Sequence, residues 1–192
     1  MATSRSGAGD APTIRLGVDD WLRAGYAILA EQGIKALKVD TLCARLGVTK
    51  GSFYWHFDGM PSYRAALIGA WGALRDEDRR DFDDTTGVAP REQLSKMMAS
   101  LLNPRHWTLE RAMREWARSD ETVAASVREA DRRVLRAVRR AFVEYGFDAD
   151  EADLRANATF AAGIGFLHLS GPVPAGQDAA RVGRFLDLML AR

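Results

Sequence analysis

Apolar residues recur at helical spacing along almost the whole chain, and this periodicity excludes most folds other than a helical one. Between residues 18 and 32, for example, Leu22, Tyr26 and Leu29 lie three or four positions apart. No stretch alternates apolar and polar residues for long enough to indicate a sheet. Glycine or proline stands near the ends of most periodic stretches, where helices stop or begin. We therefore predict an all-α protein.

The pattern predicts about nine helices. They cover approximately residues 18–32, 40–46, 49–57, 61–81, 90–102, 108–118, 121–145, 150–169 and 177–191. The small and polar residues of Met1–Thr13 predict a disordered tail. The breakers Asp58–Pro61 indicate a joint. We therefore expect a helix-turn-helix domain at residues 14–60 and a second helical domain at residues 61–192.

Composition excludes several classes of protein. Cys43 is the one cysteine, which excludes an internal disulfide and fits a reducing compartment. The three histidines lie far apart in the sequence, so we expect neither a metal site nor a cofactor. The start of the chain lacks the apolar core of a signal peptide. The most apolar stretch, residues 161–169, is far shorter than the ~20 residues of a membrane span. We expect a cytoplasmic protein without a membrane partner.

The formal net charge of +1 does not by itself indicate a nucleic-acid binder, so that function must rest on a motif. Three short helices separated by Gly33 and Gly47 match a helix-turn-helix, in which Gly47 permits the tight turn. On the third helix, Phe53 and Phe57 share one face, whereas Trp55 lies opposite. The outward residues suit base edges and phosphates of DNA: Lys50, Gly51, Ser52, Tyr54, Trp55 and His56.

The segment Leu46–Phe57, LGVTKGSFYWHF, closely resembles the recognition-helix motif of TetR-family repressors. The resemblance covers about residues 17–71. It implies base or phosphate contacts from Thr49, Lys50, Gly51, Ser52, Tyr54, Trp55 and His56. It also implies that Lys38 and Thr41, near the start of the second helix, touch phosphates. The chain departs from the family at Met60, where a lysine often contacts the DNA backbone.

Two helices of the second domain suit a homodimer. Small residues, which let helices approach closely, crowd residues 154–169: Ala156, Ala158, Ala161, Ala162, Gly163 and Gly165. The last helix has heptad-spaced residues flanked by Phe185 and Leu190: Ala179, Val182, Leu186 and Met189. Together they predict a four-helix interface, and the alternative is packing within one chain. A dimer would bind a roughly palindromic operator in double-stranded DNA.

Large apolar side chains also gather in the second domain. They suit either a plastic cavity for a small apolar effector or an ordinary core: Trp71, Met97, Met98, Leu101, Trp107, Met113 and Trp116. Polar groups of such a pocket, or else paired surface groups, are Arg111, Glu115, Arg118 and His168. The arginine run of residues 128–140 is interrupted by acids and predicts a solvated, partly ion-paired face.

Three functions remain open. The first is a repressor that a small lipophilic effector releases from its operator, because the effector binds only one of two conformations. The second is a helical DNA-binding regulator without a small-molecule effector. The third is an enzyme, for which the sequence offers no catalytic residues, phosphate loop or metal ligands. We expect a regulator that is not an enzyme.

Overall fold

Helices make up almost all of the structure. The computed structural model describes residues 16–83, 88–101, 104–169 and 177–191. Within them lie nine α-helices and no strand, as the periodicity predicted: α1 (Val18–Gln32), α2 (Val39–Leu46), α3 (Lys50–His56), α4 (Met60–Asp83), α5 (Pro90–Leu101), α6 (Pro104–Ala117), α7 (Glu121–Tyr145), α8 (Ala149–Leu169) and α9 (Gln177–Leu190). The predicted tail, Met1–Thr13, lies outside the described residues.

Two details differ from the predicted helices. A short 3-10 turn, Ile34–Ala36, lies between α1 and α2. Helix α6 begins at Pro104 rather than at Thr108. Proline is tolerated in the first turn of a helix, where its missing N–H has no partner to lose. Pro104 therefore begins α6 instead of preceding it as a breaker.

Glycine fixes the turn between α2 and α3. Gly47 follows α2 with φ 68° and ψ 31°, a left-handed conformation that suits a residue without a Cβ. The next residue, Val48, donates its N–H to the Cys43 carbonyl at 3.0 Å. The chain therefore leaves α2 sharply and enters α3 at Lys50, as a helix-turn-helix requires.

Aromatic side chains join the first four helices. The ring centroids of Trp21 on α1 and Phe53 on α3 lie 5.4 Å apart. Tyr63 on α4 lies 5.6 Å from Phe53 and 4.9 Å from Phe57. All four rings are buried. Edge-to-face contacts of this kind fix the orientation of α3 against α1 and α4. We call residues 16–59 the head and residues 60–191 the body.

Two hydrogen bonds and one glycine hold α1 against α4. The Tyr63 hydroxyl donates to the Trp21 carbonyl at 2.7 Å, and the Tyr26 hydroxyl donates to the Leu67 carbonyl at 2.7 Å. Burial raises the pKa of both tyrosines, so both hydroxyls remain protonated donors. A Cβ on Gly25 would lie 2.0 Å from the Tyr63 oxygen. The close approach of the two helices therefore requires glycine at this position.

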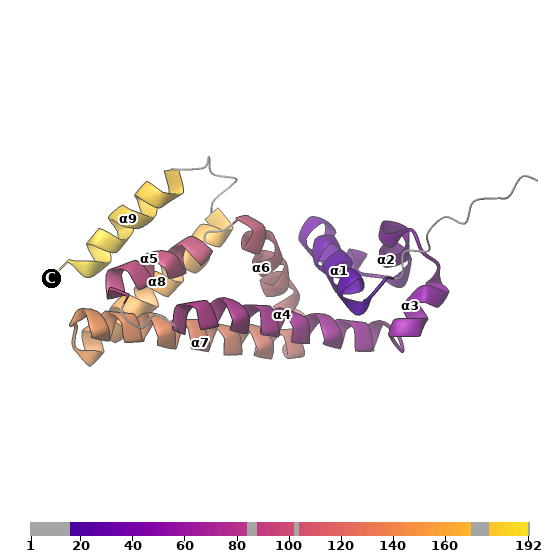
Figure 1. Cartoon of the computed structure of the whole chain (residues 1–192), viewed down its shortest axis with the longest axis horizontal. Helices are drawn as coiled ribbons and strands as arrows, with labels where there is room; N and C mark the ends of the chain where they lie inside the picture. Colours follow the sequence, from indigo (N-terminus) through magenta and orange to yellow (C-terminus); the bar gives the residue numbers. More distant parts are fainter. Residues whose placement is uncertain (1–15, 84–87, 102–103, 170–176, 192) are drawn as a thin grey trace, which may run out of the picture.

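The described residues pack into two cores. The head core continues into the body through Trp71 of α4, Met113 and Trp116 of α6, and the start of α7. The second core joins α5 and α9 to the end of α7 and the start of α8. Figure 1 shows α4 and α7 running side by side along the molecule, with α1–α3 at one end and α5, α8 and α9 towards the other. The domain boundary at residue 60 stays a prediction; it falls where α4 begins, but the head core extends past it.

Candidate DNA interface

Helix α3 presents one buried and one exposed face. Phe53 is fully buried and Phe57 is 7% exposed, whereas Tyr54 is 58% and Trp55 is 72% exposed. A large apolar side chain exposed to this extent on a small head indicates a binding surface. The side chains that were predicted to face outward therefore lie on a surface open to DNA.

The other residues predicted on α3 line the same surface. Thr49, Lys50 and Gly51 are exposed, and Ser52 and His56 are half-buried. Thr49 occupies the N-cap position of α3, but its hydroxyl makes no capping hydrogen bond. A Cβ on Gly51 would meet nothing closer than the Thr49 hydroxyl, at 3.6 Å. The absence of a side chain therefore serves no packing need within the head, and it leaves the α3 backbone open to close approach.

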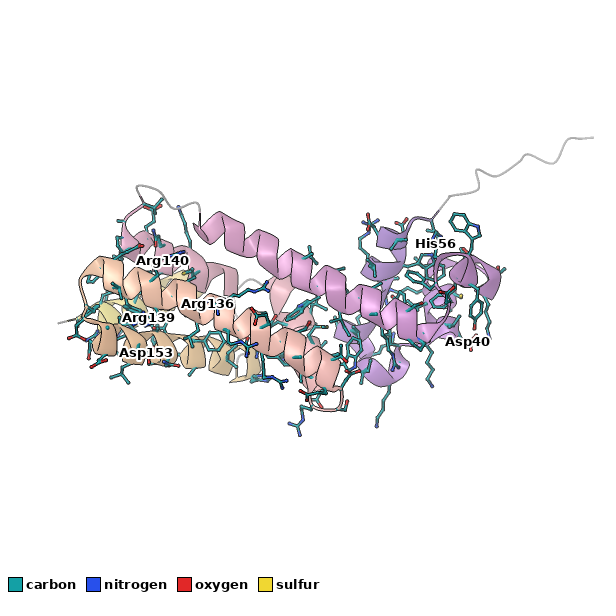
Figure 2. All side chains as sticks on the ribbon, turned by 90° about the horizontal axis from the view of Figure 1, so that it is seen from below. Asp40, His56, Arg136, Arg139, Arg140 and Asp153 are labelled. Atoms are coloured by element: carbon teal, nitrogen blue, oxygen red, sulfur yellow. The ribbon has the colours of Figure 1, made fainter. Side chains whose placement is uncertain are left out.

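Helix α2 brings two predicted contacts beside α3. Lys38 precedes α2 and is exposed, and Thr41 in its first turn is half-buried. Between them in the sequence lies Asp40, whose carboxylate is 2.6 Å from the Lys50 ammonium. The sequence pattern did not predict this ion pair, because residues ten positions apart meet only through the turn at Gly47. Figure 2 shows Asp40 and His56 at the head end of the molecule.

Met60 is the position at which the family often has a lysine. Its side chain is half-buried and packs against the head core. The residue therefore contributes apolar contact between α4 and the head in place of a charge directed at DNA. The sequence motif and the structure therefore both indicate that Met60 does not supply a backbone contact to DNA.

The residues predicted to bind an effector do not form one cluster. Trp71, Met113 and Trp116 are at most 2% exposed and lie in the head core. Met97 and Met98 belong to the second core. His168 is exposed, and so are Arg111, Glu115 and Arg118. The side chains of Leu101 and Trp107 lie outside the described part of the chain.

A groove lies elsewhere, between α4 and α7. Its volume is about 340 Å³, within the range of small-molecule sites. The lining combines small residues with one ion pair: Gly69, Gly72, Ala73, Ser126, Glu129, Ala130 and Arg133. The signal available in the sequence was the pair of glycines inside the apolar stretch of residues 65–74. Such glycines cost about 0.5–1 kcal/mol each relative to alanine.

Several charged side chains of the body form ion pairs. Arg114 of α6 donates to both carboxylate oxygens of Asp131 on α7, at 3.0 and 2.5 Å, and lies 2.8 Å from the buried Glu110. The six arginines of the run on α7 also have acidic partners, as predicted for an ion-paired face: Arg128, Arg132, Arg133, Arg136, Arg139 and Arg140. In Figure 2, Arg136, Arg139 and Arg140 lie far from the head. This run is therefore not a second basic surface beside α3.

The surfaces predicted for dimerisation are partly buried within the chain. Leu186, placed in the predicted heptad stripe, is 1% exposed and belongs to the second core, and Ala156 is fully buried. Among the described side chains of the same helices, the large apolar ones that are exposed are Leu154 and Leu188, each 65% exposed. Leu186 of the predicted heptad stripe therefore faces the second core, whereas Leu188 lies on the outer face of α9. The side chains of Ala179 and Val182 lie outside the described part.

The described residues add neither a membrane span nor a metal-binding cluster. None of their helices is long and apolar enough to cross a membrane. Among the same residues, no group of three or more histidine, cysteine or acidic side chains is arranged to hold a metal ion.

Comparisons with known proteins give the same fold and motif. Residues 22–61 match the family model of bacterial regulatory proteins, tetR family. A TetR-like transcriptional regulator from Rhodococcus sp. RHA1 has a TM-score of 0.69 and 18% identity over 95% of this chain and 96% of its own. A TetR/AcrR-family regulator from Thermobifida fusca YX-ER1 has a TM-score of 0.63 and 18% identity over 90% of this chain and 96% of its own.

A third structure is SmeT, the repressor of the Stenotrophomonas maltophilia multidrug efflux pump SmeDEF. It has a TM-score of 0.61 and 21% identity over 91% of this chain and 89% of its own. No curated protein sequence is significantly similar to the chain. The matched family model describes bacterial regulatory proteins. The exposed face of α3, the turn at Gly47 and the match over residues 22–61 identify the head as a DNA-binding domain similar to that of tetR-family regulators, and the chain shares the fold of such regulators.

Proposed function

We propose that the protein is a cytoplasmic homodimeric repressor that a small, largely apolar effector releases from a roughly palindromic operator. The exposed face of α3 supports operator binding, since Tyr54 and Trp55 leave a large part of their surface to a partner. One structural relative, SmeT, is the repressor of a multidrug efflux pump. Repression by this chain would follow when α3 occupies operator DNA that overlaps a promoter.

In the proposed interface, Lys50 reads a base edge and Tyr54 contacts a phosphate. Phosphate contacts also come from the start of α2, where Lys38 and Thr41 lie. Thr49, Gly51 and Ser52 meet the groove at the start of α3, where the helix end favours a phosphate. Trp55 packs on a thymine methyl or a sugar, and His56 hydrogen-bonds the backbone.

Operator selection tests this interface. The purified protein is incubated with random duplexes, and the selected sequences are compared for the parent, Lys50→Ala and Tyr54→Ala. Lys50→Ala should change the preferred base at one position, at a cost of about 1–3 kcal/mol. Tyr54→Ala should weaken binding on all sequences alike, because a phosphate contact carries little base information. If both variants select and bind the parent's operator with the parent's affinity, α3 does not read the DNA.

The proposed dimer uses the outer faces of α8 and α9. Leu154 and Leu188 are each 65% exposed, and Ala158 and Ala161 on α8 are also exposed. Small residues beside a leucine permit close packing against the same helices of a second copy. Leu188→Glu should separate the protomers while leaving each folded. Leu74→Glu on α4, where the leucine is 46% exposed, is the matched control and should remain dimeric. Sedimentation showing a folded monomer for the parent protein at micromolar concentration contradicts the dimer.

The effector is proposed to enter the groove between α4 and α7. Gly69, Gly72 and Ala130 offer a shallow apolar surface, and the Glu129–Arg133 pair offers polar contacts to one end of a ligand. At 100 times its dissociation constant a ligand should stabilise the protein by about 2.7 kcal/mol. The same compound should loosen operator binding, because the two sites are thermodynamically linked.

A screen of lipophilic compounds by melting temperature, followed by operator binding with each hit, tests this part. Gly72→Leu should fill the groove and abolish both effects while operator binding without the compound is retained.

A second candidate function is regulation without a small-molecule effector. The burial of Trp71, Met113 and Trp116 in the head core favours it, since these residues were the predicted pocket. Compounds that stabilise the protein without changing its affinity for DNA would support this second function.

A further inference from the structure

Trp55 lies on the side of α3 that points away from the head. A helix turns by about 100° per residue, so Trp55 lies about 200° from the fully buried Phe53. Its side chain is 72% exposed, the largest fraction among the exposed large apolar residues of the described chain. Tyr54 and Ser52 lie about 100° from Phe53 on either side of it. Helix α3 therefore has an apolar outer face at Trp55 and polar residues on its two flanks.

Gly51 leaves the helix surface open beside this tryptophan. The two residues are four positions apart, so they lie one turn apart on the same face of α3. A Cβ on Gly51 would meet the Thr49 hydroxyl oxygen at 3.6 Å, and the Trp55 side chain would stay beyond 4 Å. The outer face of α3 therefore has open space at Gly51 and a large apolar side chain one turn further on.

The position of Trp55 on α3 decides which part of DNA it meets. A recognition helix in the major groove turns its outer face to the base edges, and its flanks face the two backbones. The flank residue Tyr54 is accordingly the one proposed to contact a phosphate. Trp55 instead meets the floor of the groove, where the base edges present hydrogen-bonding groups and one apolar group, the 5-methyl of thymine. An indole gains most from burying that methyl against its apolar surface.

We propose that Trp55 is a specificity-determining residue that recognises the 5-methyl group of a pyrimidine on the floor of the major groove. The inference rests on the proposed interface, and it decides between the two contacts named there for Trp55. A sugar lies at the wall of the groove and is the same at every nucleotide, whereas the methyl distinguishes thymine from the other bases. The methyl of 5-methylcytosine occupies the same place in the groove. Binding should therefore also respond to methylation of cytosine.

The expected effect is small enough that the methyl must be removed alone. Burial of one methyl group changes an equilibrium about fourfold. Two symmetric half-sites together give a change of about 15-fold. Replacing thymine by another standard base would also change the hydrogen-bonding pattern, which has an effect of about five- to 150-fold. Deoxyuridine keeps the pairing and the O4 acceptor of thymine and lacks only the methyl.

The experiment replaces the thymines of the selected operator by deoxyuridine, one position at a time in both half-sites, at one salt concentration. The full-length parent should bind one substituted operator about 15-fold more weakly. Trp55→Ala should bind the operator more weakly than the parent and should not distinguish thymine from uracil at that position. Tyr54→Ala is the matched control, since it removes the neighbouring exposed aromatic ring from the flank. It should weaken binding to both operators and retain the parent's ratio between them.

Cytosine methylation gives a second readout at the same position. The parent should bind an operator with 5-methylcytosine there about 15-fold more tightly than one with cytosine. Trp55→Ala should bind these two operators alike. Melting temperatures establish that the variants are folded, as expected for a side chain that is largely exposed.

Two outcomes would overturn the inference about Trp55. In the first, no thymine of the operator responds to the loss of its methyl, so that Trp55 contacts a sugar or acts through its indole N–H. In the second, the thymine-to-uracil ratio in Trp55→Ala equals that of the parent, so that another residue recognises the methyl. In either case the proposed interface still stands if Tyr54→Ala and Trp55→Ala weaken operator binding. If both variants bind with the parent's affinity, the proposed interface itself fails.

Discussion

Alanine at Gly25 should destabilise the protein, although alanine normally stabilises a helix. A Cβ at this position would lie 2.0 Å from the Tyr63 oxygen, 3.0 Å from Tyr63 Cζ and 3.1 Å from Leu67 Cδ1. Tyr63 is fully buried and bonded to the Trp21 carbonyl, so it cannot withdraw without losing that bond. Overpacking costs about 1–3 kcal/mol, and the lost hydrogen bond costs about 1 kcal/mol.

Better helix propensity offsets about 0.5–1 kcal/mol of this cost. The free energy of unfolding should therefore fall by about 1–3.5 kcal/mol, and Tm should fall by roughly 2–14 °C in a chain of this size. Gly69→Ala is the matched control, because nothing lies within 4 Å of a Cβ there. It should stabilise α4 by about 0.5–1 kcal/mol. Urea and thermal unfolding measure both, and a Gly25→Ala variant as stable as Gly69→Ala would refute the close contact.

The remaining predictions concern three acidic residues. Asp131→Ala leaves the half-buried Arg114 without its bidentate partner and should lower the free energy of unfolding by about 1.5–3 kcal/mol in urea; a loss below ~0.5 kcal/mol contradicts this. Asp120→Ala removes the N-cap bonds of α7 and should cost about 1 kcal/mol in the same assay. The hydrogen bond from Arg45 lowers the pKa of Glu31 below its ordinary value of 4.5. The stabilisation it gives is present above that value and is lost as the pH falls. A Tm titration should therefore show a smaller acid-induced loss in Glu31→Gln than in the parent.

The two faces of α3 and the turn at Gly47 could be predicted from the local sequence. The step of about 100° per residue placed Phe53 and Trp55 on opposite faces, and the structure has them 0% and 72% exposed. A glycine between two short helices gave the turn at Gly47, which has a positive φ. Both inferences need only the geometry of a single helix or turn. They hold because neighbouring helices do not alter them.

Contacts between distant helices could not be predicted in the same way. Met113 and Trp116 form an apolar stripe that suits a pocket or a core equally, and the sequence does not show that α6 packs against α1 and buries both side chains in the head core. Leu186 and Leu188 lie two positions apart in an amphipathic helix, and the heptad pattern selected the buried one as the interface. The tight contact at Gly25 has no periodic signal at all. A stripe shows which face of a helix is apolar but not which helix covers it.

The length of α4 and its contacts with the head indicate how a small movement in the body can displace the recognition helix on DNA. Its 24 residues span about 36 Å, and its first two turns are fixed to the head by Tyr63 and by the Leu67 carbonyl. A tilt of about 5° about the far end of such a helix moves its head end by about 3 Å. Successive base pairs are separated by about 3.4 Å. A tilt of that size, imposed on both protomers of a dimer, therefore displaces each recognition helix by nearly one base pair. The groove at Gly69 and Gly72 lies between α4 and α7, where a bound molecule would act on this tilt directly.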